Sequence, residues 1–167
     1  MEFYKEYIGK IENFPIEGIT YRDIQPLLAN HTVFMEAIKD MGNLIEVKPD
    51  YWIALESRGF LFASALSMLF GGGVRLIRKK GKLGNSELCS VDYGLEYGKD
   101  SFEMAHLPEF TSGNIVIVDD VYATGGTMKA AQGLCEKIGY NVTDKLCLMD
   151  IGIVKNHNVK CLIKYDG

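Results

Sequence analysis

The segment from Ile115 to Thr127, IVIVDDVYATGGT, holds the residues whose types and spacing point most clearly to chemistry. Its β-branched start predicts a buried strand that ends at the carboxylates Asp119 and Asp120. The loop that follows has no side-chain bulk at Gly125 and Gly126, so its backbone N–H groups can approach an anion. The N-terminus of the next helix adds the positive end of its dipole, and the flanking threonine hydroxyls add donors. This segment therefore predicts a site for a phosphate monoester.

The two carboxylates beside this loop narrow the kind of ligand. Asp119 and Asp120 only accept hydrogen bonds when ionised, and their natural partners beside a phosphate are the vicinal hydroxyls of a ribose or the water shell of Mg²⁺. A strand that enters an ordinary turn is the alternative, but the whole segment favours a sugar phosphate. The chain has neither a G-x-x-x-x-G-K-[ST] loop nor a G-x-G-x-x-G fingerprint, which argues against P-loop hydrolases and dinucleotide-dependent dehydrogenases.

A sheet must hold these residues, and the chain has the pattern of one. Apolar runs punctuated by glycine alternate with segments of helical periodicity, which is typical of an α/β fold with a mostly parallel central sheet and flanking helices. One helix is predicted over Val33–Val47, with Thr32 as its N-cap. The other predicted strands are Tyr51–Leu55, Val74–Arg78, Ile115–Val118, Leu146–Ile151 and Val159–Tyr165, and the other helices are Phe60–Phe70 and Met128–Ile138, the latter ended by Gly139.

A basic cluster and an irregular segment follow the strand Val74–Arg78. Five of the eight residues from Arg75 to Lys82 are basic, and in a chain of net charge −4 such a cluster attracts a polyanion. A solvated charged face is the alternative. The segment Leu83–Asp100 is rich in glycine and polar residues but holds Tyr93 and Tyr97. Long irregular segments in compact domains are often lids, and a frayed hairpin arm is the other interpretation.

Composition limits the remaining classes. With 167 residues and 47% hydrophobic side chains, the chain predicts one domain with a sizeable core. Its net charge of −4 and pI near 5.4 argue against a protein that coats nucleic acid. Four cysteines without a C-x-x-C pair argue against a zinc site or a thiol–disulfide motif. The longest uncharged stretch, Gly59–Val74, is too short to cross a bilayer, and the first residues lack a secretory signal pattern, so a cytoplasmic location without membrane contact is expected.

The segment Ile115–Thr127 resembles the signature of the type I phosphoribosyltransferases, which hold the ribose 5-phosphate part of phosphoribosyl pyrophosphate (PRPP) in such a loop. Four more segments are similar to motifs of the adenine phosphoribosyltransferase family and occur in the same order. The resemblance runs from Phe14 to Ile151. The four segments are Phe14–Ile24 (FPIEGITYRDI), Leu55–Phe62 (LESRGFLF), Ile77–Leu83 (IRKKGKL) and Leu95–Gly98 (LEYG).

This resemblance implies a reaction and an architecture. It implies transfer of the phosphoribosyl group of PRPP to adenine, giving AMP and pyrophosphate in purine salvage, with Mg²⁺ as cofactor. It also implies that residues 1–167 form a single phosphoribosyltransferase domain, in which residues 1–30 form a small N-terminal hood and residues 79–106 a flexible lid hairpin. PRPP and adenine are the expected partners, together with a second copy in a homodimer and no nucleic acid.

The resemblance also assigns roles to residues. Arg58 and Lys79 are expected to act on the pyrophosphate, and Glu96 to manage the proton of the purine ring. In the hood, Tyr21 is expected to stack on adenine and Arg22 to approach its N7, while Ile151 closes the other face. Asp119 and Asp120 would hold Mg²⁺ indirectly or through the hydroxyls of PRPP, and a cis peptide is expected between Glu56 and Ser57. The remaining expected substrate-binding residues are Glu56, Ser57, Gly59, Lys82, Tyr97, Ala123, Thr124, Gly125, Gly126 and Thr127.

Two departures from the family keep other functions open. Gly84-Asn85 stands where many members have Pro-Gly, so the lid hinge lacks a proline that would stiffen it. Thr20 stands where an apolar residue is usual beside the stacking aromatic, which leaves a 6-oxopurine (hypoxanthine, guanine or xanthine) phosphoribosyltransferase as an alternative. A non-catalytic regulator that senses PRPP and binds nucleic acid is a third interpretation. The 13 residues before Phe14, where the resemblance begins, and the negative net charge argue against it, because no DNA-reading module is expected there.

Overall fold

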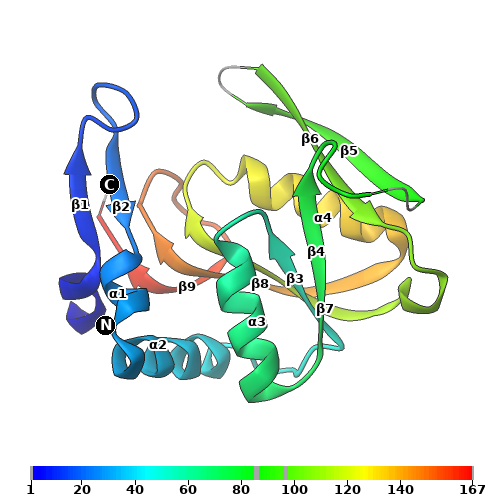
Figure 1. Cartoon of the computed structure of the whole chain (residues 1–167), viewed down its shortest axis with the longest axis horizontal. Helices are drawn as coiled ribbons and strands as arrows, with labels where there is room; N and C mark the ends of the chain where they lie inside the picture. The colour runs from blue at the N-terminus through cyan, green and yellow to red at the C-terminus, as the bar shows by residue number, and fades with distance from the viewer. Residues whose placement is uncertain (1, 85–86, 96–97, 167) are drawn as a thin grey trace.

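The computed structural model describes residues 2–84, 87–95 and 98–166, and within 93–100 it describes only the backbone of the strands. Its core is a seven-stranded sheet in the order β5-β6-β4-β3-β7-β8-β9 (Figure 1). The strands from β4 to β9 along this order run parallel, and β6 and β5 are antiparallel additions at one edge. The expected mostly parallel α/β architecture is confirmed. The strands are β3 (Tyr51–Leu55), β4 (Gly73–Lys79), β5 (Leu88–Leu95), β6 (Gly98–Ala105), β7 (Gly113–Tyr122), β8 (Tyr140–Asp150) and β9 (Lys160–Lys164).

Helices cover both faces of the sheet, and the alternation along each strand divides the core between them. Trp52 and Ala54 of β3 face the helices α2 (His31–Asn43) and α3 (Gly59–Phe70), whereas Ile53 and Leu55 face α4 (Gly126–Ile138). Because neighbouring side chains of a strand point to opposite faces, a continuous apolar strand fills two cores at once. Both clusters are built from side chains that are almost completely buried.

The start of α2 differs from the prediction. The helix begins at His31 and its N-cap is Asn30, whose side-chain oxygen accepts a hydrogen bond from the N–H of Val33 at 3.2 Å. Thr32 is therefore not the cap. Asn30 also ends the short helix α1 (Gln25–Ala29), so one extended residue separates the two helices, and that residue must be the cap. The helix ends at Asn43, and Leu44 and Ile45 beyond it still pack against the core.

The strand β7 is longer than predicted. It continues past Val118 to Tyr122, because β8 pairs with it as far as the partners Tyr122 and Asp150. Asp119 and Asp120 consequently lie within the strand, near its end, and not after it. The predicted helix over 128–138 also begins earlier, at Gly126, and ends as expected with Gly139 in a left-handed conformation (φ 117°).

Two hairpins stand at opposite ends of the molecule (Figure 1). At one end, a 3₁₀ turn (Glu2–Tyr7) precedes β1 (Gly9–Glu12) and β2 (Thr20–Asp23), which pair antiparallel in a sheet of their own. At the other end, β5 and β6 form an antiparallel hairpin, so of the two interpretations of this segment the structure has the hairpin and not the irregular loop over these strands. A second 3₁₀ turn (Pro108–Phe110) leads from β6 to β7. None of the helices that the structure describes has the length and apolar character needed to span a bilayer.

The contact between α2 and α3 yields a test of the packing. A Cβ at Gly42 would lie 2.1 Å from the ring of Phe70, so Gly42→Ala must displace that ring. Overpacking of this kind costs about 1–3 kcal/mol, and we expect the free energy of unfolding in urea to fall by that amount. Gly133→Ala in α4 is the matched control, because nothing lies within 4 Å of its added Cβ. It should instead stabilise the chain by about 0.5–1 kcal/mol, and equal effects of the two substitutions would contradict this packing.

Candidate active site

Between the strands β3 and β7, the connections to the following strands change direction across the sheet. From β3 the helix α3 leads to β4 on one side, whereas from β7 the helix α4 leads to β8 on the other side. The loops after these two neighbouring strands therefore diverge and leave a crevice at their carboxyl ends. The crevice brings together two segments that lie far apart in the sequence. One is the turn Glu56–Gly59, and the other is the segment Asp119–Thr127.

The loop between β7 and α4 has the geometry expected of an anion site. Gly125 is left-handed (φ 81°) and caps α4, which favours glycine at this position. A small cavity of about 60 Å³ lies inside the loop. A Cβ at Gly126 would meet nothing closer than the Thr124 hydroxyl at 3.8 Å, so this glycine borders open space. The cavity is lined by Asp119, Val121, Tyr122, Ala123, Thr124, Gly125, Thr127 and Met128.

The carboxylates of Asp119 and Asp120 are held in a poorly solvated place. Burial, and next the neighbouring charge of Asp120, raise the pKa of Asp119 well above its ordinary value. Burial also raises the pKa of Asp120, although the charge of Arg58 opposes this shift. The N–H of Asp120 donates to Asp119 Oδ1 at 2.9 Å, which fixes the first carboxylate. Two adjacent buried carboxylates are costly, and a ligand that donates hydrogen bonds to them relieves the cost.

Arg58 joins three parts of the site. Its Nε lies 2.7 Å from Asp120 Oδ2, and its Nη1 donates to the hydroxyl of Tyr21 at 2.8 Å. The guanidinium also stands 5.2 Å from the centre of the Tyr21 ring. The hood hairpin, the turn after β3 and the carboxylates after β7 thus meet at one side chain. Apart from its ion pair with Arg58, Asp120 Oδ2 is a buried acceptor without a hydrogen-bond partner among the described residues.

This acceptor bears on the expected magnesium ion. Asp120 Oδ2 and the Asp119 carboxylate are hard oxygen ligands, which suits Mg²⁺ or its bound water. No group of three or more acidic, histidine or cysteine side chains gathers around a common point in the described ranges. The residues therefore fit an ion that takes most of its ligands from water and from a bound phosphate, and they do not form an all-protein cage.

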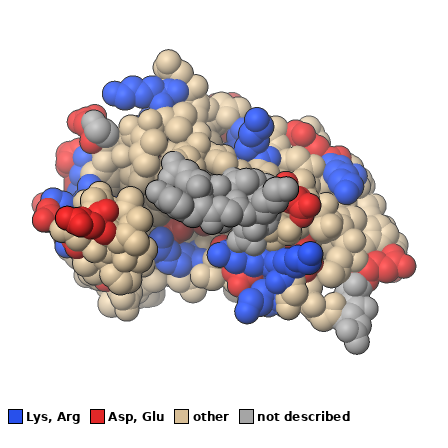
Figure 2. Space-filling model, turned by 90° about the horizontal axis from the view of Figure 1, so that it is seen from above, with Lys and Arg blue, Asp and Glu red and all other residues tan. Residues whose placement is uncertain are grey.

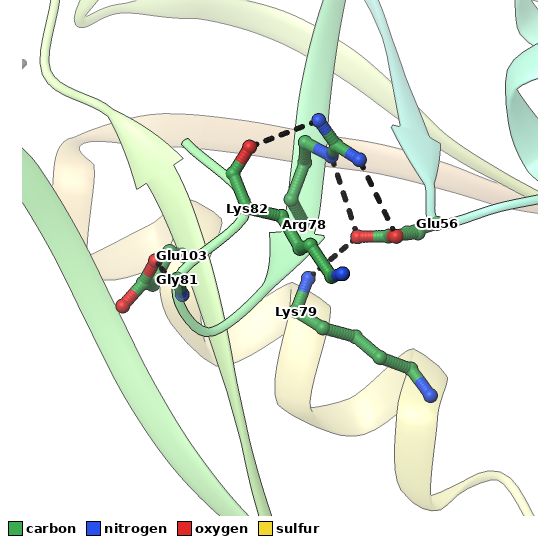
Figure 3. A network of polar contacts seen from close by, with 6 residues as sticks. All are labelled: Glu56, Arg78, Lys79, Gly81, Lys82 and Glu103. Carbon is green, nitrogen blue, oxygen red and sulfur yellow. Dashed lines mark hydrogen bonds and ion pairs between the residues drawn. The ribbon is translucent and has the colours of Figure 1, made fainter. Parts of the chain in front are cut away.

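Glu56 has a different position from the one expected. Figure 3 shows its carboxylate turned toward the basic turn after β4, where it accepts from the backbone N–H of Lys79 at 2.9 Å and pairs with Arg78 at 3.3 Å. Burial alone would raise the pKa of Glu56, but these partners outweigh it and lower that pKa below its ordinary value. Glu56 thus fastens the basic turn to the end of β3. The Glu56–Ser57 peptide is cis, as expected.

The basic turn has a second carboxylate anchor and carries the expected cations. Glu103 of β6, itself buried, accepts from the N–H of Gly81 at 2.9 Å, and Arg78 Nη1 donates to the Lys82 carbonyl at 2.9 Å (Figure 3). The side chain of Lys79 extends away from Glu56 in the same view. Lys79 and Lys82 are exposed. Figure 2, seen from above the view of Figure 1, shows Lys and Arg side chains gathered on this face of the molecule.

The hood residues are only partly where they were expected. Tyr21 faces Arg58 and has Phe14 at 5.4 Å, edge to face. Arg22 lies instead over the ring of Tyr165, at 4.0 Å from its centre. Ile151 packs against the core, and its N–H donates to the Tyr122 carbonyl at 3.1 Å. Ser57 is exposed, Gly59 is buried, and Glu96 and Tyr97 lie outside the described residues.

Sequence reasoning singled out the basic cluster that contains Arg78 but missed the pairing of Arg78 with Glu56. It also missed two residues that shape the site. Tyr165 provides the stacking surface for Arg22. Asp150 at the end of β8 accepts from the N–H of Gly152 and pairs with His157 at 2.9 Å, so it organises the loop that carries Ile151. The position of Asp150 at the carboxyl end of a predicted strand was the available signal. Nothing in the local sequence pointed to Tyr165.

Comparison with known proteins gives a consistent result. The Phosphoribosyl transferase domain family matches residues 23–159. The chain is 39% identical to the adenine phosphoribosyltransferase of Hydrogenovibrio crunogenus (96% of this chain, 95% of the relative) and 42% identical to that of Carboxydothermus hydrogenoformans (88% and 86%). Among solved structures, the adenine phosphoribosyltransferase of Thermoanaerobacter pseudethanolicus has a TM-score of 0.88 at 35% identity, covering 98% of this chain and 99% of that one. The Saccharomyces cerevisiae enzyme, complexed with adenine and an imino-altritol bisphosphate, has a TM-score of 0.88 at 34% identity, covering 96% and 95%.

The raised pKa of Asp119 predicts a pH dependence of stability. Because folding disfavours the charged form, the free energy of unfolding should fall as the pH rises from the ordinary aspartate range, about 3.9, through the raised pKa. Asp119→Asn removes the charge, so its advantage in stability over the wild type should grow with pH. Urea unfolding across this range measures the difference. Asp166→Asn, at an exposed position, is the control, and parallel curves for wild type and Asp119→Asn would contradict the burial of this charge.

Proposed function

The chain belongs to the phosphoribosyl transferase family, and from this premise we propose that it is an enzyme that transfers the phosphoribosyl group of PRPP to adenine, giving AMP and pyrophosphate. The observation that carries the proposal is the position of Arg58, which joins the carboxylate pair, the turn after β3 and the hood aromatic in one crevice. These are the parts needed for a sugar phosphate, a pyrophosphate and a flat base. The chain and its curated relatives cover nearly the whole of each other, so the activity concerns the entire chain.

The loop and the carboxylates hold the ribose 5-phosphate part of PRPP. The backbone N–H groups at the start of α4 and the hydroxyls of Thr124 and Thr127 surround a cavity that fits a phosphate, and Ala123, Gly125 and Gly126 keep it free of bulk. Asp119 and Asp120 accept from the vicinal hydroxyls of the ribose. These hydroxyl donors satisfy Asp120 Oδ2, which has no donor of its own among the described residues.

The leaving group is managed by the cations around the turn after β3. Departure of pyrophosphate leaves positive charge on the anomeric carbon and adds negative charge to the leaving oxygen, so fixed cations near that oxygen lower the barrier. Arg58, Lys79 and Lys82 supply this charge, with Ser57 and Gly59 offering backbone N–H groups. Mg²⁺, when bound to PRPP beside Asp119 and Asp120, would supply further neutralisation of the pyrophosphate. Glu56 acts through Arg78 and the backbone of Lys79, as a residue that positions the turn.

The base lies between the hood and the loop after β8. Tyr21 stacks on adenine, and Ile151 closes the opposite face. Arg22 approaches N7 of the base, either after leaving the ring of Tyr165 or from its position over that ring. Stacking of a base on an aromatic ring contributes roughly 1–3 kcal/mol. We assign Glu96 to the proton of the purine ring and Tyr97 to packing of the closed lid; both are proposals from the family pattern at positions outside the described residues. The hood over 1–30 and the lid over 79–106 are likewise proposed as parts of one domain.

Adenine is proposed as the base, and a 6-oxopurine is the second candidate. Adenine phosphoribosyltransferases are the relatives and solved structures that the chain matches along its length, which favours adenine. Thr20 is exposed at the start of β2 and its hydroxyl can both donate and accept, which is the one feature that favours a 6-oxo group. None of the contacts made by the described residues of the site favours a PRPP-sensing regulator. We propose the cytoplasm as the compartment, where the four free cysteines would remain reduced.

A homodimer is proposed from the resemblance, and α3 supplies a surface for it. The helix has no charged residue, yet Leu61, Met68 and Leu69 are 46%, 88% and 44% exposed. Apolar patches of this kind mark protein interfaces.

The mass of the protein in solution tests the proposed homodimer. Sedimentation should give twice the chain mass for the wild type and the single-chain mass for Met68→Glu, because a buried unpaired charge is costly. Ile11→Glu, which places the same charge on an exposed position of β1, should remain dimeric. A wild-type protein that sediments as a single chain would contradict the proposal.

The central experiment is a turnover assay with PRPP, Mg²⁺ and a panel of adenine, hypoxanthine, guanine, xanthine and uracil. Adenine should be converted at least about tenfold more efficiently than the others, a difference that needs only about 1.4 kcal/mol of transition-state discrimination. Comparable kcat/KM for adenine and hypoxanthine would remove adenine as the assigned base and leave phosphoribosyl transfer intact. Tyr21→Ala should raise KM for the base more than KM for PRPP.

Gly126→Val is the control that separates PRPP binding from folding. The added side chain enters open space beside the loop, so the chain should fold with unchanged secondary structure. It would stand where the phosphate must approach the backbone, and PRPP affinity should fall at least about a hundredfold, or 2.7 kcal/mol. Unchanged affinity in calorimetry would show that the loop does not hold the phosphate.

A further inference from the structure

A second cavity, of about 350 Å³, lies behind the phosphate loop, between α4 and the strand β8. We call it the rear cavity. It shares the loop residues with the small cavity inside the loop but adds side chains from α4, from β8 and from the segment before β9. Its size is at the lower end of the range for small-molecule sites, about 300–1,000 Å³. The lining residues are Tyr122, Thr124, Gly125, Gly126, Met128, Lys129, Gln132, Lys145, Asn158 and Val159.

The charge of the rear cavity is of one sign. Lys129 and Lys145 line it, and no aspartate or glutamate is among its described lining residues, although the whole chain has a net charge of −4. Lys145 Nζ donates to Gln132 Oε1 at 2.9 Å, which holds the ammonium group toward α4 and leaves its other donors available. The Gln132 amide nitrogen already donates to Glu136 Oε1 at 2.8 Å, so the further neutral donor of the cavity is the amide of Asn158. A cavity with this set of groups attracts an anion.

Tyr122 adds a hydroxyl group to the lining of the rear cavity. Most of the residue is buried, with 7% exposed, but its hydroxyl is not one of the buried polar atoms that lack a partner, so the oxygen is accessible from the cavity. Its ring is fixed against His157, with ring centres 4.2 Å apart, and His157 is in turn held by Asp150 at 2.9 Å and by the N–H of Val159 at 3.2 Å. Here a rigidly held hydroxyl opens into the cavity that contains the two lysines.

We propose that the rear cavity is a second anion site, which binds orthophosphate or a phosphomonoester through the ammonium groups of Lys129 and Lys145 and the hydroxyl of Tyr122. The site differs from the phosphate loop because neither lysine lines the small cavity inside that loop. Both phosphate sources share the same chemistry, and the cavity has room for a small organic part as well.

Occupation of this site acts on the phosphate loop through Gly125. The Tyr122 hydroxyl lies 2.6 Å from the place where a Cβ of Gly125 would be, so it packs directly behind the left-handed residue that turns the loop. An anion that bonds to this hydroxyl therefore contacts the back of the loop whose front holds the 5-phosphate. By linkage, the anion and PRPP must alter each other's affinity by the same factor. This coupling rests on the proposed function, whereas the site itself does not.

Calorimetric titration of orthophosphate into the whole protein saturated with PRPP and Mg²⁺, without a base, tests the site. PRPP fills the loop, so the remaining binding reports the rear cavity, and one site per chain is expected. The double variant Lys129→Met, Lys145→Met should bind orthophosphate at least about tenfold more weakly, and Tyr122→Phe several-fold more weakly. Lys155→Met removes an exposed lysine outside the cavity and should bind as the wild type does.

The alternative outcomes are distinct. No binding to the PRPP-saturated protein, or binding unchanged in the lysine and tyrosine variants, overturns the site. Ribose 5-phosphate and AMP, titrated in the same way, show by tighter binding than orthophosphate whether a phosphomonoester is preferred. An unchanged KM for PRPP at saturating orthophosphate overturns the coupling. If the protein fails to bind PRPP, the proposed function is wrong, and the site is then tested by whether the double variant loses one of the orthophosphate sites of the wild type.

Discussion

The close approach of α3 to β7 is the constraint on which the site depends. A Cβ at Gly59 would lie 2.7 Å from the carbonyl oxygen of Val118, so only glycine lets the first turn of α3 reach the end of β7. That approach sets Arg58 at 2.7 Å from Asp120, and Arg58 in turn holds the Tyr21 hydroxyl of the hood. Two divergent loops and a separate hairpin become one site because a single residue has no side chain.

The same proximity makes the site unfavourable for the stability of the folded chain. Asp119 and Asp120 are adjacent and poorly solvated, and one guanidinium must compensate both while it also serves the hood. Such a cluster lowers the stability of the fold, but the groups that would bind substrate are already desolvated and fixed before the substrate arrives. The rest of the fold compensates through two apolar cores on opposite faces of the sheet, both almost fully closed to water.

The local pattern of the sequence predicted the elements well where one interaction dominates. The strand Tyr51–Leu55 is observed with the predicted bounds, because a short continuous apolar run is best buried as a central strand with both faces covered. The loop with Gly125 followed from the rarity of residues that accept its conformation. Prediction failed where partners come from far along the chain. Asn30 and not Thr32 caps α2, because α1 ends there. The strand β7 continues to Tyr122 because β8 pairs with it. Glu56 turns to Arg78 because β4 lies beside β3.

The junction between the β5–β6 hairpin and the rest of the sheet is narrow. The strand β6 pairs with β4 at Arg78 with Glu103 and at Lys79 with Phe102, and just beyond β4 the N–H of Lys80 donates to the Ser101 carbonyl at 3.0 Å. Arg75 anchors the base of the hairpin through the carbonyl oxygens of Ala105 and Phe110. Lys79 belongs to both structures, because it is the last residue of β4 and also pairs with Phe102 of the hairpin. If the hairpin closes over the crevice as proposed, the backbone of Lys79 moves with it, and enclosure of the substrates is then coupled to the placement of that cation.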